Sequence, residues 1–204
     1  MIAIDFYYDF GSPNAYLAHR TLPPLAERHG VALNWHPILL GGLFKITQNQ
    51  PPMIAFKDVP LKISYMNQQM ARFLMRHQID FAWNPHFPVM TTTLMRGAIF
   101  SQGKNWEARY IDEMFQAVWV EKLKMDDPSV IVPRLAQAGL PADEIAAATQ
   151  DDAVKKALFA ATEAAKDRGA FGSPAMFVGA EQFFGKDSLD DLDWYLGNLA
   201  SGAA

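Results

Sequence analysis

Residues 9–17 read Asp9-Phe10-Gly11-Ser12-Pro13-Asn14-Ala15-Tyr16-Leu17 and join a short apolar run to a helix. The preceding residues 2–8 carry no charge except Asp5, and the length of this run suits a buried strand. Gly11 permits a tight turn, Ser12 is a favoured N-cap, and Pro13 suits the first helical position. Such a helix start favours an anion. Ser12 is therefore either a plain cap or a hydroxyl placed to donate to a thiolate, phosphate or carboxylate.

The composition of the chain excludes several classes of function. The 204 residues are half hydrophobic and carry a net charge of −4, without the basic face of a nucleic-acid-binding protein. There is no cysteine, which excludes a disulfide framework, a cysteine nucleophile and a thiolate metal site. No apolar run approaches the roughly 20 residues of a membrane span. No signal peptide is evident either, so we expect a cytoplasmic protein without membrane or nucleic-acid partners.

The beginning of the chain predicts a βαβ unit. A helix is expected from Pro13 to about His29, with Gly30 as its C-terminal stop. The dipeptide Pro23-Pro24 falls inside this helix and predicts a kink or break. Residues 31–40 alternate apolar and polar side chains and predict a second strand, parallel to the first.

The middle of the chain is predicted to be helical. Residues 41–60 are rich in turn formers, and helical periodicity follows from there to about Arg168. One expected helix ends near His77, and its apolar face is formed by Ile63, Met66, Met70, Phe73 and Leu74. Further helices are expected at 91–101, from about 106 to 119, from 127, from 141 and at 151–167. Their apolar faces predict a helical subdomain packed on itself.

The end of the chain returns to strands. Residues 175–178 and 182–184 flank a turn at Gly179-Ala180 and predict a hairpin, followed by a helix that starts near Gly185. The order β-α-β, helices, β-β-α predicts an α/β, thioredoxin-like fold with an inserted all-helical domain. We place the discontinuous thioredoxin-like domain at 1–45 and 169–204, and the helical insertion at 46–168.

A second stretch, Gly169-Ala170-Phe171-Gly172-Ser173-Pro174-Ala175, stands directly before the hairpin. A proline in a Gly-rich turn before a strand is a candidate for a cis peptide bond, although an ordinary trans turn is the commoner case. A small polar residue at a helix start, combined with a later Gly-x-Pro before a strand, is the layout of a thioredoxin-type site.

The chain resembles the DsbA-like branch of the thioredoxin fold, and within it the kappa-class glutathione transferases and the 2-hydroxychromene-2-carboxylate isomerases. The stretches that carry the resemblance occur in the family's order along nearly the whole chain. They are residues 9–17, Gly41-Gly42-Leu43-Phe44-Lys45, Asn49-Gln50-Pro51-Pro52, Lys62-Ile63-Ser64-Tyr65-Met66, 169–174 and Phe184-Gly185-Lys186-Asp187.

The resemblance implies glutathione as cofactor. Ser12 stands at the position of the attacking cysteine of DsbA-type oxidoreductases, where a serine in the glutathione-using relatives hydrogen-bonds the glutathione sulfur. It implies that the backbone of Ser173, ahead of Pro174, pairs with the cysteinyl backbone of glutathione. By the same correspondence Asn49 and Lys62 hold the glycyl end.

The last pair of the matched positions, Lys186 and Asp187, is implied to hold the γ-glutamyl end of glutathione. Asp187 accepts from the α-ammonium in this correspondence. A lysine at 186 departs from the small polar residue or asparagine of the family. It contacts the γ-glutamyl carboxylate either through its ammonium or through its backbone N–H. Taken singly, Lys62, Asn49 and Asp187 also suit a solvated helix residue, a turn former and a helix cap.

Three functions remain open. The first is a glutathione-dependent isomerase that interconverts 2-hydroxychromene-2-carboxylate and trans-o-hydroxybenzylidenepyruvate in the catabolism of aromatic compounds. The second is a kappa-like glutathione transferase or peroxidase that conjugates or reduces electrophiles. The third is a non-catalytic binder of thiols or extended peptides. We favour the first, because a compact chain in which neither a transit peptide nor a peroxisomal tail is evident suits it better than an organellar transferase. The resemblance implies a homodimer.

The small aromatic substrate of the first function is expected between the Ser12 turn and the helical insert. Tyr65, Trp83, Phe87 and Arg96 are the candidates for its aromatic walls and for a cation facing a carboxylate. No metal site is expected, because the histidines lack the spacing of metal ligands.

Overall fold

A computed structural model describes residues 2–201, so Met1 and residues 202–204 at the ends of the two predicted thioredoxin-like segments lie outside the described residues. The four strands are β1 (Ala3–Tyr8), β2 (Ala32–Pro37), β3 (Ala175–Val178) and β4 (Glu181–Phe184). The helices are α1 (Pro13–His29), α2 (Leu40–Thr47), α3 (Pro52–Ala55), α4 (Pro60–His77), α5 (Thr92–Ser101), α6 (Glu107–Trp119), α7 (Pro128–Gln137), α8 (Ala142–Ala148), α9 (Asp152–Asp167) and α10 (Leu189–Ser201), with a 3₁₀ turn η1 (Lys186–Ser188).

The strands form one mixed sheet in the order β2-β1-β3-β4. β1 and β2 are parallel, as the sequence predicts, and β3 pairs antiparallel with both β1 and β4. The predicted hairpin is therefore confirmed, and the architecture is the predicted thioredoxin-like fold. The second strand ends at Pro37, earlier than predicted, because α2 already begins at Leu40.

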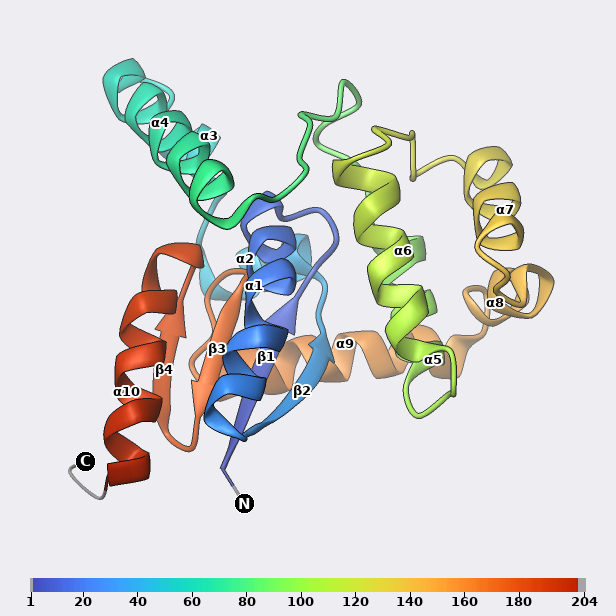
Figure 1. Cartoon of the computed structure of the whole chain (residues 1–204). Coiled ribbons are helices and arrows are strands. Elements are labelled where there is room, and N and C mark those ends of the chain that lie inside the picture. The colour runs from blue at the N-terminus through green and yellow to red at the C-terminus, as the bar shows by residue number, and fades with distance from the viewer. Residues whose placement is uncertain (1, 202–204) are drawn as a thin grey trace.

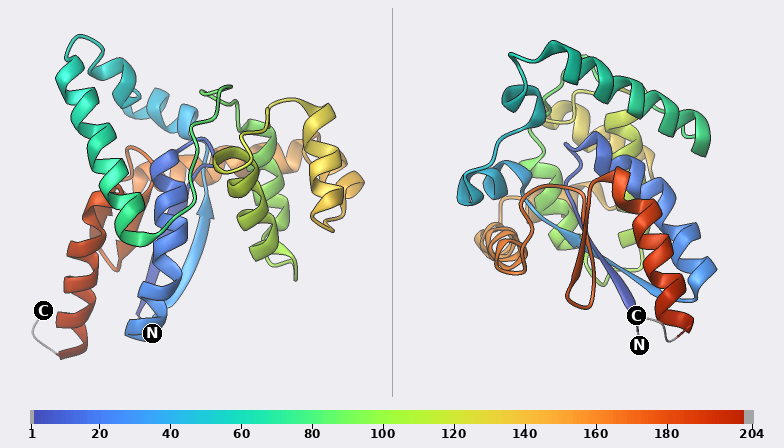
Figure 2. Two further views of the ribbon diagram at one scale, coloured as in Figure 1. Left: turned by 45° about the horizontal axis from the view of Figure 1, so that its top comes forward. Right: turned by 90° about the vertical axis from the view of Figure 1, so that its left-hand side faces the viewer.

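Helices cover both faces of the sheet (Figures 1 and 2). On one face, Ile4, Phe6 and Tyr8 point into the main core with buried residues of α1 and α10. On the other face, a smaller core joins Tyr7 and Phe177 to Leu43 of α2 and Ala165 of α9. Helices α5 to α8 lie to one side of the sheet, and α6 lies near α1 (Figure 1).

The prolines of α1 do not break it, so the break, one of the two alternatives predicted from Pro23-Pro24, is wrong. One helix runs from Pro13 to His29 and ends at Gly30, whose backbone adopts the left-handed conformation. The side chains of Leu22 and Leu25, on both sides of the prolines, are buried in the main core. Tertiary packing thus offsets the two missing backbone donors.

The segment from Gly41 to Pro60 contains two helices that the sequence analysis placed in a turn-rich region. α2 includes Gly41-Gly42 and has a cap residue, Leu39, without a side-chain cap hydrogen bond. Its stabilisation comes from elsewhere in the chain, through the burial of Leu43 and through an external carboxylate described below. Local propensity alone could not indicate this helix.

The predicted packing of the helix that ends at His77 is only partly correct. Met70 of α4 is buried, and Phe73 and Leu74 pack on the main core, but residues 52–69 have no buried side chain. We call residues 52–69 the arm. The arm leads away from the sheet at the upper left of Figure 1, and none of its apolar side chains is among those that form the main core or pack on it.

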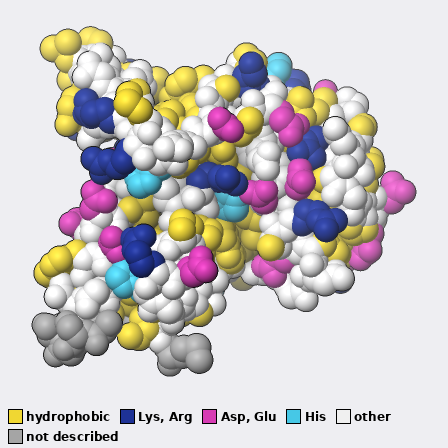
Figure 3. Space-filling view, viewed as in Figure 1, with side chains coloured by type: hydrophobic (Ala, Val, Ile, Leu, Met, Phe, Trp, Pro, Cys, Tyr) yellow, Lys and Arg dark blue, Asp and Glu magenta, His cyan; other side chains and the backbone are white. Residues whose placement is uncertain are grey.

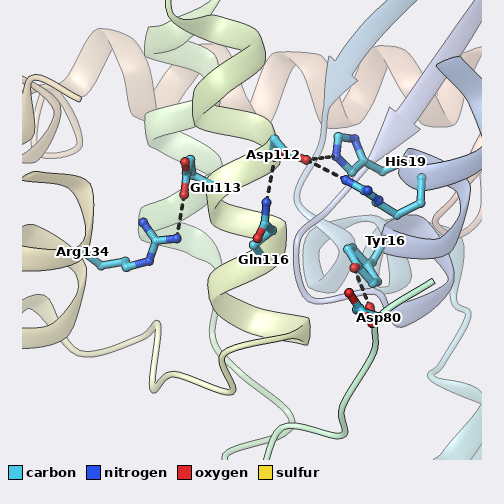
Figure 4. A network of polar contacts seen from close by, with 8 residues as sticks. Tyr16, His19, Asp80, Asp112, Glu113, Gln116 and Arg134 are labelled. Carbon is cyan, nitrogen blue, oxygen red and sulfur yellow. Dashed lines mark hydrogen bonds and ion pairs between the residues drawn. The ribbon is translucent and has the colours of Figure 1, made fainter. Parts of the chain in front are cut away.

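Helices α1 and α6 are joined by a polar network (Figure 4). Asp112 of α6 lies 3.0 Å from Nε2 of His19 and 3.2 Å from a guanidinium nitrogen of Arg20, and it also accepts a hydrogen bond from Gln116. The His19 hydrogen bond is the largest cause of the pKa of Asp112 falling to about 2.

Among residues 2–201, no helix is both long and apolar enough to cross a membrane.

Candidate active site

Ser12 caps α1 as the sequence predicts. Its backbone is extended, and its side-chain oxygen accepts a hydrogen bond of 3.2 Å from the N–H of Ala15. Ser12 as a whole is only 4% exposed, and its hydroxyl donates to the carbonyl oxygen of Ser173 at 2.8 Å. The helix start and the second motif of the sequence, 161 residues apart, therefore meet through this one side chain.

The Ser173–Pro174 peptide bond is cis, which confirms that prediction; the bond between Phe87 and Pro88 is also cis. The hydroxyl oxygen of Ser173 accepts from the backbone N–H of Asp9 at 3.2 Å. The carbonyl of Pro174 accepts from the N–H of Gly185 at 3.0 Å, which attaches the turn before Lys186 to the same place. Three segments that are distant in sequence thus converge at Ser12.

Asp9 is a residue of this site to which the sequence analysis assigned no role. Asp9 is 1% exposed, and its side chain accepts a hydrogen bond from the N–H of Gly11, next to Ser12. Burial raises the pKa of the Asp9 carboxyl, while hydrogen bonds from Thr91, Gly11 and Leu40 act in the opposite direction. The sequence signal for its role is an aspartate at the end of a buried strand. An unpaired charge there is costly, so the carboxylate must have hydrogen-bond partners.

The predicted γ-glutamyl pair differs in exposure. Lys186 is 4% exposed, forms an ion pair with its neighbour Asp187, and lies 5.5 Å from the ring of Phe73 in α4. The side chain of Asp187 is 63% exposed. Of the two side chains, only that of Asp187 is therefore open to a ligand from solvent, while the ammonium of Lys186 is already paired.

The predicted glycyl pair comes from two different segments. Asn49, just after α2, donates its side-chain amide to the carbonyl of Phe171 at 2.8 Å, so it lies beside the loop that contains Ser173. Lys62 is an exposed residue of the arm, and its ammonium lies 3.6 Å from the centroid of the Phe56 ring. The structure therefore attaches Asn49 directly to the site and places Lys62 on the arm.

Two of the four predicted substrate residues belong to one aromatic cluster beside the turn. Trp83 and Phe87 lie with ring centroids 6.2 and 5.8 Å from that of Trp119, and Trp83 is 49% exposed. The indole N–H of the buried Trp119 donates to the carbonyl of Phe10 at 2.7 Å. The cluster is thus fixed to the residue two positions before Ser12.

The other two predicted substrate residues lie elsewhere. Tyr65 is exposed on the arm, with Arg72 of the same helix over its ring. Arg96 of α5 donates towards the carbonyl of Thr149 at the end of α8, at 3.4 Å. These contacts connect neither Tyr65 nor Arg96 to the Trp83–Phe87 cluster. The described residues contain no group of three or more His, Cys, Asp or Glu that could hold a metal ion.

Comparisons with known proteins agree with this geometry. The chain is 28% identical over 193 residues to 2-hydroxychromene-2-carboxylate isomerase of Sphingobium xenophagum, covering 95% of this chain and 97% of the relative. It is 26% identical over 217 residues to glutathione S-transferase kappa 1 of Homo sapiens, covering 98% of this chain and 92% of the relative. A solved structure of a 2-hydroxychromene-2-carboxylate isomerase superposes with a TM-score of 0.84 at 27% identity, covering 97% of this chain and 96% of that one.

The strongest assignment comes from a family model. The model described as DSBA-like thioredoxin domain matches residues 3–197, which include both turns of the site and all the helices between them. The chain therefore belongs to the DSBA-like thioredoxin domain family.

Proposed function

We propose that this protein is a glutathione-dependent isomerase that interconverts 2-hydroxychromene-2-carboxylate and trans-o-hydroxybenzylidenepyruvate in the catabolism of aromatic compounds. The observation that carries the proposal is the Ser12 hydroxyl, which caps a helix and lies 2.8 Å from the backbone of Ser173. Relatives named for this isomerase activity match almost the whole chain.

The donor set suits glutathione. A hydroxyl at a helix N-terminus is a donor that favours a thiolate over a thiol, in the way that helix N-termini lower cysteine pKa values. The chain has no cysteine of its own, so a thiolate at Ser12 must come from another molecule. Asn49 joins the Ser173 loop, and Asp187 follows the turn that is bonded to Pro174. Polar groups for a tripeptide thus lie on both sides of Ser12.

Each residue of the site receives a role in this proposal. Ser12 would turn its hydroxyl from the Ser173 carbonyl to the thiolate, and the Ser173 backbone would pair with the cysteinyl residue. Asp187 would accept from the α-ammonium, and Lys186 would contribute its backbone N–H, because its ammonium is held by Asp187. Asn49 and Lys62 would bind the glycyl carboxylate. Bound glutathione would supply a nucleophile that adds to the substrate reversibly and leaves again unchanged.

The aromatic substrate is assigned to the Trp83–Phe87 cluster. Partly exposed aromatic rings next to the turn can stack on a planar substrate and reduce the access of water. Tyr65 and Arg96 are not part of this assignment, because the first lies on the arm and the second bonds to α8.

The proposal is tested by turnover with catalytic amounts of glutathione. Purified protein, the chromene acid and a small fraction of an equivalent of glutathione are mixed, and isomerisation is followed by ultraviolet absorbance. The expected result is complete conversion with all of the glutathione recovered as free thiol. Absence of conversion, or conversion without added glutathione at the same rate, would contradict it.

A transferase or peroxidase is the second candidate, because kappa-class relatives also match 90% to 98% of the chain. The same assay distinguishes it, since conjugation or reduction consumes glutathione in proportion to substrate. A crystal soaked with glutathione that shows no density beside Pro174 would instead favour the non-catalytic binder. The homodimer and the cytoplasmic location stay predictions.

A further inference from the structure

The buried carboxylate of Asp9 connects the starts of three helices. One oxygen accepts from the backbone N–H of Gly11 at 2.8 Å, and the same oxygen accepts from the hydroxyl of Thr91 at 2.5 Å. The second oxygen accepts from the N–H of Leu40 at 2.7 Å. Gly11 precedes the cap of α1, Leu40 is the first residue of α2, and Thr91 is the cap residue of α5.

The fit around this carboxylate leaves little freedom. A Cβ atom built on Gly11 would lie 3.3 Å from the Asp9 oxygen and 3.3 Å from a methyl carbon of Thr91. The backbone N–H of Asp9 donates to the Ser173 hydroxyl oxygen, and its carbonyl accepts from the N–H of Ser12 at 3.0 Å. Asp9 therefore contacts both turns of the site through its backbone while its side chain holds the surrounding helices.

We propose that Asp9, together with Thr91, is the positioning residue that fixes the Ser12 hydroxyl in the geometry for donation to the thiolate. Two of the partners of the carboxylate are backbone N–H groups and can only donate, so the side chain must offer acceptors to both. Asparagine keeps the shape but turns one acceptor into a donor. The turn would then lose a bond or shift, and Ser12 would shift with it. This inference rests on the proposed function, because it requires a glutathione thiolate that accepts from the Ser12 hydroxyl.

Positioning and charge predict opposite changes of the thiol pKa. A negative charge near a thiolate raises its pKa, so removal of the charge alone would lower the pKa of the bound thiol. Displacement of the Ser12 donor would raise it instead. The pKa of glutathione bound to Asp9→Asn therefore separates the two roles.

The experiment titrates the thiol of bound glutathione by the ultraviolet absorbance of the thiolate, and measures kcat and KM, in five variants of the full chain. Asp9→Asn and Thr91→Val each remove one hydrogen bond around the Asp9 carboxylate, whereas Thr91→Ser keeps the hydroxyl at position 91. Ser12→Ala reports on the thiolate site itself. Thr149→Val is the matched control, because Thr149 is also buried and donates to a helix carbonyl far from the site.

Asp9→Asn and Thr91→Val should raise the pKa of the bound thiol and lower kcat about tenfold, with KM for glutathione near the wild-type value. Thr91→Ser and Thr149→Val should behave as wild type. If Asp9→Asn does not fold, Thr91→Val carries the test.

Two outcomes overturn the positioning role: a wild-type thiol pKa and kcat in folded Thr91→Val, or a lowered thiol pKa in Asp9→Asn. In these cases Ser12→Ala still raises the thiol pKa, so the proposed function stands. An unchanged thiol pKa in Ser12→Ala would instead overturn the proposed function, and this inference with it.

Discussion

The Ser12 turn and the arm are both assigned to glutathione, but they are held in very different ways. The turn is buried and bonded to Ser173, Trp119 and the Asp9 cluster. The arm has no buried side chain, and Leu61 within it is 83% exposed. Hydrophobic side chains gather over this region at the upper left of Figure 3.

The difference separates chemistry from binding. A donor to a thiolate must be held in one geometry, which a buried network of hydrogen bonds provides. A cation that binds one end of a flexible peptide needs only to be within reach, and an exposed lysine can act in this way. We therefore expect substitutions in the turn to change kcat and stability, and substitutions in the arm to change KM alone.

The largest effect is expected for Ser12→Ala. Loss of the donor should lower kcat of the isomerisation about 10²- to 10³-fold, the usual effect of removing one preorganised donor to a developing or stable anion. Steady-state kinetics with saturating glutathione measures this. Ser101→Ala is the control, because Ser101 is also buried and its hydroxyl donates to the carbonyl of Ala98 in α5. Equal kcat in Ser12→Ala and wild type would show that the Ser12 hydroxyl does not take part in the reaction.

The next effect concerns the arm. Lys62→Gln should raise KM for glutathione about tenfold, with kcat unchanged, through loss of the charge that we propose binds the glycyl carboxylate. Its free energy of unfolding should stay within about 0.5 kcal/mol of wild type, as for most exposed substitutions. Lys57→Gln, a second exposed lysine of the arm, is the control with the same loss of charge. A KM that rises equally in both variants would show a general effect of charge and not a contact.

A smaller effect is expected for the bond between the aromatic cluster and the turn. Trp119→Phe keeps an aromatic ring but loses the N–H that donates to Phe10, and should lower the free energy of unfolding by about 1 kcal/mol or more. Urea unfolding measures this. Trp194→Phe changes an exposed indole and should have no effect of this size. Equal losses in the two variants would remove the contrast between the buried turn and the exposed surface.

The smallest effect is a pH dependence of stability that comes from the interface of α1 and α6, outside both regions. Burial lowers the pKa of His19 from 6.5, while its hydrogen bond to Asp112 acts in the opposite direction. Between the lowered value and 6.5 the unfolded chain binds more protons than the folded one, so stability falls as the pH falls through this interval. His19→Gln can still donate to Asp112 but does not titrate.

Urea unfolding of wild type and His19→Gln from about pH 7 to about pH 5 measures this contribution. The variant should lose less stability than wild type over this range. Parallel curves for the two proteins would show that His19 does not contribute. The substitution His19→Gln should leave kcat and KM for glutathione unchanged, because His19 lies outside both the turn and the arm.

The sequence predicts the buried half of the site well, because its signals are local. The cap residue Ser12 and the helix start at Pro13 follow from the residue type and its neighbours. The cis bond at Pro174 does not, because a trans bond is the commoner case, and it is indicated only together with the Ser12 motif. Their meeting follows from the βαβ and hairpin order, which brings both turns to the same end of the sheet.

The rest depends on contacts that are distant in sequence. α2 escapes prediction because an aspartate 31 residues away accepts from its first N–H. The prolines of α1 predict a kink or a break, but the helix is unbroken and the leucines on both sides of the prolines are buried in the core. The apolar pattern of α4 predicts packing along its whole length, yet only the part from Met70 onward meets the core.

The most direct test of the central claim is the pKa of the thiol of glutathione bound to the wild-type protein, followed by the absorbance of the thiolate. A free cysteine thiol titrates at about 8.5. We predict that the bound thiol titrates clearly below the value of free glutathione measured under the same conditions, and that Ser12→Ala moves it back towards that value. A bound thiol that titrates as free glutathione does, in wild type and Ser12→Ala alike, would contradict the assignment of Ser12 as the donor to the thiolate.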